Sequence, residues 1–391
     1  MKKIKTPKLY HRNCLICGKS NKRKFFQSDF FETFPNGDYF YKLNTYVLCS
    51  NCLFVYTNPD VSDYLREKIY SNLVIEDPNK NHEKSYRSKI HYQMFKELVD
   101  KKLLNSKSRL LEIGCGTGGL LKNVLNGYKL KKKNIFGIEI SNILINYLKK
   151  NKFQVFKNLK EIKKYKNRFD FIILDNVFEH LDKPFKELKI IKTFLKKNGK
   201  IYCSIPNILK TRTNISDPLN HECNYLLSNF KYVFEKSGYK IEKFKYRYYW
   251  LNSLISKSTK NLKYFKFKTN KSLRQIQLLK NILKKNEIQN KFLYKKINKL
   301  KNKKILLYGA GNHALSFLFM FKKLNLNLIG ISDSNKTYHG KKRFGYKIID
   351  PNNIWKLKYD KIVISSRAFQ DEIYKYLINL NIERKKIYTL Y

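Results

Sequence analysis

The stretch that decides the fold is residues 109–120, which read RLLEIGCGTGGL. An apolar run leads into closely spaced glycines and then a helical pattern, so the stretch predicts a strand, a tight turn and a helix. Glycines let the backbone approach a nucleotide or nucleoside closely, and the free N–H groups of a helix N-terminus favour such a ligand. The stretch therefore predicts one unit of an α/β fold with a ligand at its turn.

A second short strand, residues 134–138, ends at Glu139, about 20 residues after the turn. A carboxylate at this position can accept hydrogen bonds from both hydroxyls of a ribose. Glu112 lies inside the first strand, and the turn reads Glu-x-Gly-x-Gly-x-Gly instead of the Gly-x-Gly-x-x-Gly of dinucleotide sites. These two features distinguish the expected ligand from a dinucleotide.

The pattern resembles the first motif of class I S-adenosylmethionine-dependent methyltransferases. Residues 169–181, FDFIILDNVFEHL, are similar to the fourth strand of that class and its catalytic-face loop, and residues 199–207, GKIYCSIPN, to the fifth strand. The resemblance implies a central Rossmann-like domain with S-adenosylmethionine as cofactor. The residues that it assigns to the cofactor are Glu112, Gly114, Gly116, Gly118, the ribose acid Glu139, the adenine-side Asn158, Asp175 and Asn176.

Two Cys-x-x-Cys pairs, Cys14 with Cys17 and Cys49 with Cys52, are separated by 31 residues. Each pair places two thiolates on one tight turn, and two facing turns supply the four-sulfur tetrahedral shell that zinc prefers. Four thiolates leave no open coordination position, so we expect a structural and not a catalytic zinc ion. The alternative is a chance pairing of reduced, buried cysteines.

A second strand–glycine–helix pattern, KILLYGAGNHA, begins at residue 304, and residues 327–333 and 359–366 supply further strand patterns. They predict a C-terminal Rossmann-like domain whose turn and helix N-terminus would accept a diphosphate. The alternative is a packing domain without a ligand. Apolar residues at helical spacing predict a long amphipathic helix over residues 259–304.

The chain is strongly basic, with 82 Lys+Arg against 30 Asp+Glu and a net charge of +52. Such a charge attracts polyanions, so RNA is a partner to test. The lysines are spread along the whole chain, however, and residues with AT-rich codons are abundant, which genomic base composition explains without selection for binding. A run of about 18 apolar residues and a signal-peptide pattern are both missing, so we expect a cytoplasmic protein.

The order of these parts resembles the sugar C-methyltransferases that act on nucleotide-linked deoxyketosugars. That family joins a four-cysteine zinc domain, a methyltransferase domain and a Rossmann-like domain. The resemblance implies an α/β chain with a zinc-binding domain at 1–65, a class I methyltransferase domain with a catalytic insertion at 66–258, and a long helix plus a Rossmann-like substrate-binding domain at 259–391. It also implies a nucleotide-sugar substrate and a role in surface glycan biosynthesis.

The catalytic residues that the resemblance implies are His180, His221 and Glu222. In the family the insertion reads Tyr-His-Glu-His, where the carboxylate and the neighbouring histidine are implicated in proton abstraction next to a ketone. Residues 220–223 read Asn-His-Glu-Cys here, and a thiol is a poor replacement for imidazole as a base near neutral pH. O- or N-methylation of a sugar therefore stays open beside C-methylation. An RNA methyltransferase and a non-catalytic sugar-nucleotide binding protein are the alternatives from other classes.

Overall fold

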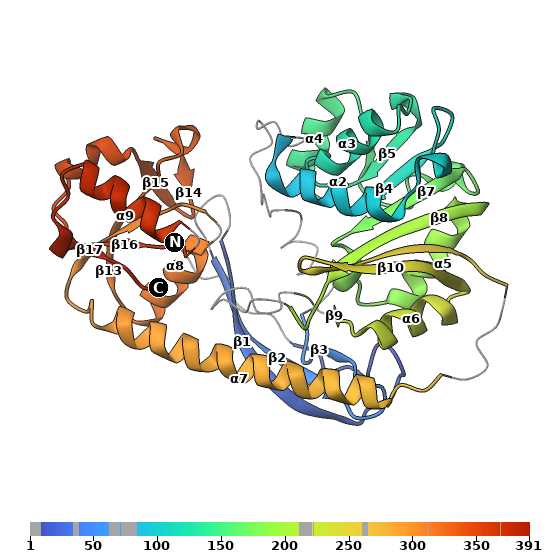
Figure 1. Ribbon diagram of the computed structural model, residues 1–391, viewed down its shortest axis with the longest axis horizontal. Coiled ribbons are helices and arrows are strands. Elements are labelled where there is room, and N and C mark those ends of the chain that lie inside the picture. The colour runs from blue at the N-terminus through green and yellow to red at the C-terminus, as the bar shows by residue number, and fades with distance from the viewer. Residues whose placement is uncertain are drawn as a thin grey trace.

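The computed structural model contains three β-sheets, of four, seven and six strands (Figure 1). It describes residues 9–33, 39–61, 71, 84–210, 221, 223–259, 265–311, 313–367 and 369–391. Within these ranges, no helix combines the length and the apolar character that crossing a lipid bilayer requires.

The first sheet is built on the hairpin of β1 (Lys22–Thr33) and β2 (Tyr39–Cys49) and has the order β1-β2-β3-β9. Its last strand, β9 (Cys223–Asn224), comes from the middle of the chain and pairs antiparallel with β3 (Val55–Thr57). This sheet therefore crosses the predicted domain boundary at residue 65. The pairing brings Cys223 and Asn224 onto the cysteine-containing part of the chain.

The second sheet has the order β10-β11-β8-β7-β4-β5-β6. Strands β4 to β8 are parallel, and the β10–β11 hairpin closes one edge antiparallel to β8. The bounds are β4 (Leu110–Ile113), β5 (Ile135–Ile138), β6 (Gln154–Phe156), β7 (Phe169–Asp175), β8 (Leu195–Pro206), β10 (Tyr239–Arg247) and β11 (Trp250–Lys257). The direction of winding reverses between β4 and β7, and ligands bind at the carboxyl ends of strands at such a switch point.

Each face of this sheet has its own apolar core, because successive strand residues point to opposite faces. Leu110 and Leu111, adjacent in β4, belong to different cores. One core includes residues of α2 (Tyr86–Leu98), α3 (Gly119–Gly127) and α4 (Asn142–Lys150), and the other those of α5 (Pro184–Phe194) and α6 (Leu227–Lys236). The α5–α6 core also contains Cys14, Cys49 and Cys52, so the cysteine turns share an apolar core with this sheet and its helices.

The third sheet has the order β14-β15-β13-β12-β16-β17 and carries the second glycine turn. Its elements are β12 (Lys304–Tyr308), α8 (His313–Lys323), β13 (Asn327–Ser332), β14 (Lys342–Arg343), β15 (Tyr346–Ile349), β16 (Lys361–Ile364), α9 (Gln370–Asn379) and β17 (Ile387–Tyr388). Strands β12, β13, β15, β16 and β17 are parallel to their neighbours within this group. The C-terminal α/β pattern predicted from residue 304 is present.

A long helix, α7 (Asn270–Asn298), runs between the first and third sheets (Figure 1). Ile276 and Leu279 pack with residues of β2 and β3, whereas Leu293 and Ile297 pack in the core of the third sheet. The predicted helix over 259–304 is too long at both ends. A capping box at Thr269 starts the helix, residues 265–268 are not helical, and the chain reaches β12 at Lys304.

Candidate functional site

The glycine turn after β4 lies at the switch point of the second sheet. Gly114, Gly116 and Gly118 have φ values of 71°, 52° and 72°, a region that side chains other than glycine rarely adopt. A Cβ atom on Gly114 would overlap the side chain of Val177, and one on Gly118 would lie 2.7 Å from Leu148. The space next to Gly116 is open, so the turn exposes backbone where a cofactor can approach it.

Glu139 ties the end of β5 to this turn. Its Oε2 accepts a hydrogen bond from the Gly116 N–H at 2.8 Å, and its Oε1 accepts from the N–H groups of Ile140 and Ser141 at 2.8 and 2.9 Å. A carboxylate offers about four acceptor positions, so Oε2 retains one for a ligand hydroxyl. Glu139 thus holds the turn as well as facing the predicted ribose position.

The other predicted cofactor residue on this side, Asn158, is exposed. Its side chain accepts from the Lys160 N–H at 3.0 Å and donates to Glu161 at 3.2 Å. Asn158 therefore stabilises a local turn after β6, and its adenine-side role stays a prediction.

Glu112 is buried in β4, two residues before the glycine turn, with 3% of its surface exposed. Burial raises the pKa of this carboxyl well above its ordinary value, and the nearby Asp175 and Glu139 raise it further. Within the described part of the chain, its Oε2 makes no hydrogen bond. A buried polar atom without a partner is costly, so the position fits a ligand or an ordered water molecule that brings one.

Asp175 and Asn176, at the carboxyl end of β7, belong to a network that the sequence did not reveal. Nδ1 of His91, in α2, lies 2.9 Å from Oδ1 and 2.8 Å from Oδ2 of Asp175. Asn176 donates to Asp175 at 3.1 Å and accepts from the indole N–H of Trp250, in β11, at 2.8 Å. The network fixes the two predicted cofactor residues through one side chain from α2 and one from β11. His91 and Trp250 are single residues with no motif around them, so only the tertiary structure identifies them.

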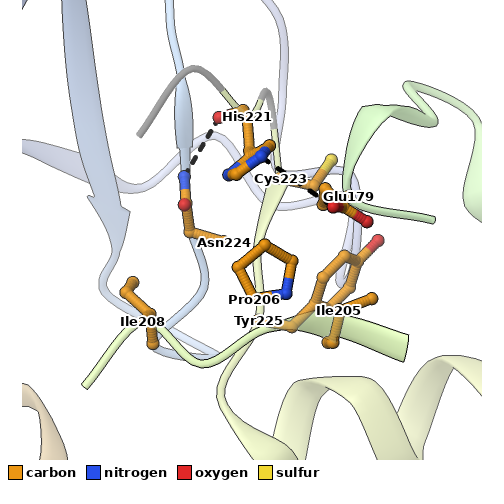
Figure 2. A pocket seen from close by; sticks show the side chains of 8 residues that line it. All are labelled: Glu179, Ile205, Pro206, Ile208, His221, Cys223, Asn224 and Tyr225. Atoms are coloured by element: carbon orange, nitrogen blue, oxygen red, sulfur yellow. Dashed lines mark hydrogen bonds and ion pairs between the residues drawn. The ribbon is translucent and has the colours of Figure 1, made fainter. Parts of the chain in front are cut away.

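A pocket lies at the same sheet edge, between the ends of β7 and β8 and the segment before β9 (Figure 2). Its lining residues are Glu179, Ile205, Pro206, Ile208, His221, Cys223, Asn224 and Tyr225. His221, one of the predicted catalytic residues, lines this pocket, and its ring centroid lies 4.9 Å from that of His180, a second predicted catalytic residue. Nε2 of His221 also lies 3.8 Å from Oε1 of Glu179. The pocket therefore places imidazole and carboxylate groups next to one another.

The third predicted catalytic residue, Glu222, lies outside the described residues. Cys223, which replaces the family histidine, donates its thiol proton to the Leu181 carbonyl at 3.3 Å. Glu179 was not singled out from the sequence, although it directly precedes His180. Its burial, with 1% of its surface exposed, is what marks it, and a lone glutamate in a loop gives no sign of that in the sequence.

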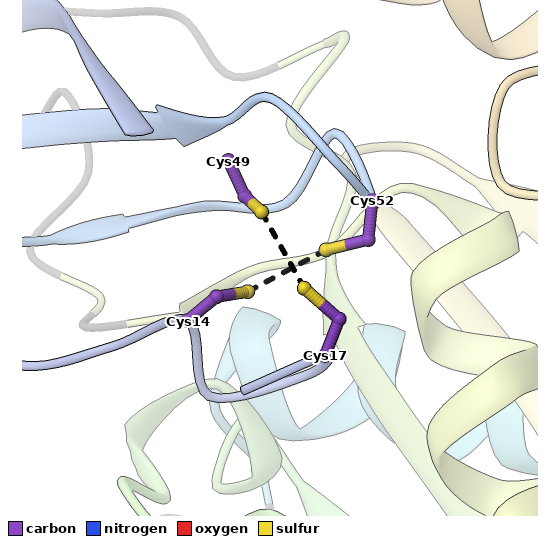
Figure 3. Close-up of side chains that lie close together, drawn as sticks. All are labelled: Cys14, Cys17, Cys49 and Cys52. Atoms are coloured by element: carbon purple, nitrogen blue, oxygen red, sulfur yellow. Dashed lines mark hydrogen bonds between the residues drawn. The ribbon is translucent and has the colours of Figure 1, made fainter. Parts of the chain in front are cut away.

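The four N-terminal cysteines come together as two crossed pairs (Figure 3). Sγ atoms of Cys14 and Cys52 lie 3.5 Å apart, as do those of Cys17 and Cys49. A tetrahedral zinc ion with Zn–S bonds of about 2.3 Å separates its sulfur ligands by about 3.8 Å. The four thiolates would fit such an ion after a small increase in the distances between their sulfur atoms.

The protonation of these thiols is uneven. The hydrogen bond to Cys49 raises the pKa of Cys14 to about 12, whereas hydrogen bonds from Cys14 and Cys52 lower the pKa of Cys49 to about 2. Zinc ligands must be deprotonated, so a divalent cation would have to displace the protons that the cluster retains.

The C-terminal glycine turn repeats one contact of the first. Gly309 has a φ of 102°, and the N–H of Ala310 donates to Oδ2 of Asp333 at 2.6 Å. Asp333 directly follows β13, just as Glu139 directly follows β5. Both turns are therefore held by an acid at the end of the neighbouring strand.

Two family models match the chain. Residues 73–243 match a model described as a methyltransferase domain, and residues 301–388 match one described as C2185-like, N-terminal. Together with the strand order and the glycine turn, the first match shows that the central part of the chain is a class I S-adenosylmethionine-dependent methyltransferase domain. S-adenosylmethionine is the cofactor of this fold.

Individual relatives are distant. The malonyl-[acyl-carrier protein] O-methyltransferase of Halalkalibacterium halodurans is 28% identical over 116 residues, which cover 26% of this chain and 42% of that relative. Among solved structures, a putative type 11 methyltransferase from Sulfolobus solfataricus has 23% identity and a TM-score of 0.34, covering 40% of this chain and 88% of its own. A SAM-dependent methyltransferase from Aquifex aeolicus has 20% identity and a TM-score of 0.34, with coverages of 46% and 98%.

Proposed function

We propose that this protein transfers a methyl group from S-adenosylmethionine to a nucleotide-linked sugar for surface glycan biosynthesis. The observation that carries the proposal is the contact of His180 with His221, which lines a pocket at the same sheet edge as the glycine turn. The order of the cysteine, methyltransferase and C-terminal α/β segments supports a sugar nucleotide. The C-terminal turn, with Asp333 beneath it, would hold the diphosphate at backbone N–H groups.

In this proposal the residues of the turn hold the cofactor, which supplies an electrophilic methyl group. Gly116 leaves the backbone open to it, and Glu139, which accepts from the Gly116 N–H, would also accept a hydrogen bond from its ribose. The His91–Asp175 pair keeps the end of β7 in place. Correct placement of donor and acceptor is worth several kcal/mol in such a displacement, so these residues act mainly by positioning.

For C-methylation, a base removes the proton from the carbon next to the ketone, and that carbon takes the methyl group. Glu222 is the proposed base, with His180 or His221 assisting. For O- or N-methylation the same groups accept the proton of a sugar hydroxyl or amine. Because cysteine stands at position 223, where the related family has histidine, the proposal includes both C-methylation and O- or N-methylation.

We further propose that Cys14, Cys17, Cys49 and Cys52 hold a structural zinc ion, supported by their sulfur–sulfur distances. The amide of Asn229, in α6, donates to the Cys52 carbonyl at 2.7 Å. Zinc would thereby fix the cysteine turns against the methyltransferase sheet.

The test incubates the full chain with S-adenosylmethionine and a panel of dTDP-, CDP- and GDP-linked 4-keto and reduced sugars, and measures S-adenosylhomocysteine. Turnover with a sugar nucleotide is expected. Deuterium uptake next to the ketone in the absence of cofactor identifies enolisation and selects C-methylation. No turnover with the whole panel, together with methylation of RNA, would overturn the proposal.

RNA methylation is the second candidate because of the net charge of +52. Affinity for RNA falls steeply as salt rises, since binding releases counterions from the phosphates. Saturation by a sugar nucleotide depends far less on salt, so the salt dependence of substrate binding separates the two candidates.

A further inference from the structure

We propose that Glu179, His180 and His221 bind a divalent first-row transition-metal ion at the wall of the pocket in Figure 2, which Glu179 and His221 line. The candidate ligand atoms of the three side chains all lie within 4.8 Å of one another. This is a second metal site, separate from the four cysteines, and none of its residues belongs to that cluster.

The three proposed ligands come from two segments of the chain, and different contacts hold each segment in place. Glu179 and His180 belong to a short 3-10 helix (Phe178–His180) that directly follows β7 of the central sheet. His221 lies two residues before β9, and the amide of Asn224, in β9, donates to its carbonyl at 3.1 Å. Because β9 pairs with β3, the cysteine-containing sheet fixes this ligand.

The distance between the carboxylate and the imidazole is short enough for one ion to bind both groups. Oε1 of Glu179 and Nε2 of His221 are 3.8 Å apart, longer than a hydrogen bond. Metal–ligand distances of 2.0–2.2 Å place neighbouring ligand atoms about 3 Å apart, so small side-chain rotations suffice. Figure 2 shows the imidazole of His221 directed toward the Glu179 carboxylate.

The charge of the site also favours a cation. Glu179 is 1% exposed, and a buried carboxylate is costly unless it is paired or coordinates a metal. A divalent cation bound by the carboxylate and both imidazoles would place positive charge beside this buried carboxylate.

Ligand type selects the metal. Two imidazole nitrogens and one carboxylate oxygen suit Zn²⁺, Fe²⁺, Co²⁺ or Mn²⁺ better than Ca²⁺ or Mg²⁺, which prefer oxygen. Three protein ligands leave coordination positions open, in contrast to the closed four-sulfur cluster. Glu179 and His221 line a pocket that also includes Ile205, Pro206 and Ile208, which would give a further ligand room beside the ion.

The role of the ion, unlike its binding, rests on the proposed function. An open position at this sheet edge would take a carbonyl or hydroxyl oxygen of the substrate, and a Lewis acid there makes the adjacent proton more acidic. His180 and His221 would then be metal ligands, and proton removal would fall to another group such as Glu222.

Mn²⁺ is the probe for the test, because thiolates prefer zinc and the cysteine cluster stays filled. The full chain, without a polyhistidine tag, is treated with a chelator until one zinc ion per chain remains in the cysteine cluster, and it is then titrated with Mn²⁺ while electron paramagnetic resonance counts the free ion. We expect one bound Mn²⁺ per chain, and an affinity at least about tenfold lower in Glu179→Gln and in His221→Gln. The control is His339→Gln, because His339 also pairs with a carboxylate, Asp350, at 3.2 Å, and it should bind Mn²⁺ as the wild type does.

Zinc content and the circular dichroism spectrum establish that each variant is folded. Wild-type protein that binds no Mn²⁺, or folded Glu179→Gln and His221→Gln that both retain full affinity, would overturn the site. Methyl transfer by a wild-type protein that binds no Mn²⁺ overturns the metal site and leaves the proposed function standing. Mn²⁺ binding without methyl transfer to any sugar nucleotide overturns the proposed function and leaves the metal site standing.

Discussion

The backbone N–H of Gly116 donates to the carboxylate of Glu139 at 2.8 Å, so the cofactor turn and the end of the neighbouring strand form one unit. The same carboxylate accepts two further N–H groups at the start of α4. Any ligand that uses Glu139 therefore also depends on the conformation of the turn. The first prediction tests this coupling.

Glu139→Ala should weaken binding of S-adenosylhomocysteine about 10- to 100-fold, because a charged hydrogen bond contributes about 1.5–3 kcal/mol. Isothermal titration calorimetry measures the change. Asp333→Ala removes the corresponding contact at the C-terminal turn and should leave the affinity for this ligand as it is. Equal affinity in Glu139→Ala and the wild type would contradict the assignment of the cofactor site.

His91→Phe should lower the free energy of unfolding of the central sheet by about 1–3 kcal/mol, because Asp175 loses its imidazole partner. The chain has two tryptophans, and Trp355 is 72% exposed. In a Trp355→Phe background, Trp250 is the sole tryptophan, and it lies in contact with His91. Urea unfolding followed by its fluorescence measures the loss. An unchanged midpoint, as expected for the control His11→Phe at an exposed position, would show that the network carries no stability.

Glu112 should make the wild type less stable as pH rises. Burial raises the pKa of Glu112 in the folded chain, so above about pH 4.5 the unfolded chain ionises this group first, and the proton equilibrium increasingly favours unfolding. Glu112→Gln removes this contribution. The stability of the variant relative to the wild type should therefore increase between pH 5 and pH 8, as urea unfolding at each pH measures. A difference independent of pH would mean that Glu112 titrates alike in both states.

Cys49→Ser should lose about one zinc ion per chain and destabilise the first sheet, because a structural site depends on all four ligands. Metal analysis of the purified chain measures the loss. Cys223→Ser, outside the cluster, should retain zinc. Identical zinc content in Cys49→Ser and the wild type would rule out the cysteine site.

The features predicted correctly from the sequence are those that depend on the spacing of residues close together along the chain. The glycine turn, the acid after β5 and the two Cys-x-x-Cys turns each depend on residues that are neighbours along the chain. The long helix was predicted with wrong ends, because apolar periodicity continues past the point where Thr269 caps the helix. Periodicity marks a face, whereas a cap marks an end.

The features missed depend on contacts between distant segments. β9 pairs Asn224 with Val55, and His91 reaches Asp175 across 84 positions. A lone histidine or glutamate has the same appearance in the sequence whether it is solvated or buried in a network. Glu179 shows this most clearly, because only its burial beside His221 distinguishes it from the many other charged residues.

The central claim, methyl transfer to a nucleotide sugar, is tested most directly with S-adenosylmethionine that carries a fully deuterated methyl group. Mass spectrometry of the sugar-nucleotide fraction should show the intact deuterated methyl group on the sugar, with an equal amount of S-adenosylhomocysteine. An unlabelled sugar-nucleotide panel, with the label recovered in RNA, would contradict the account.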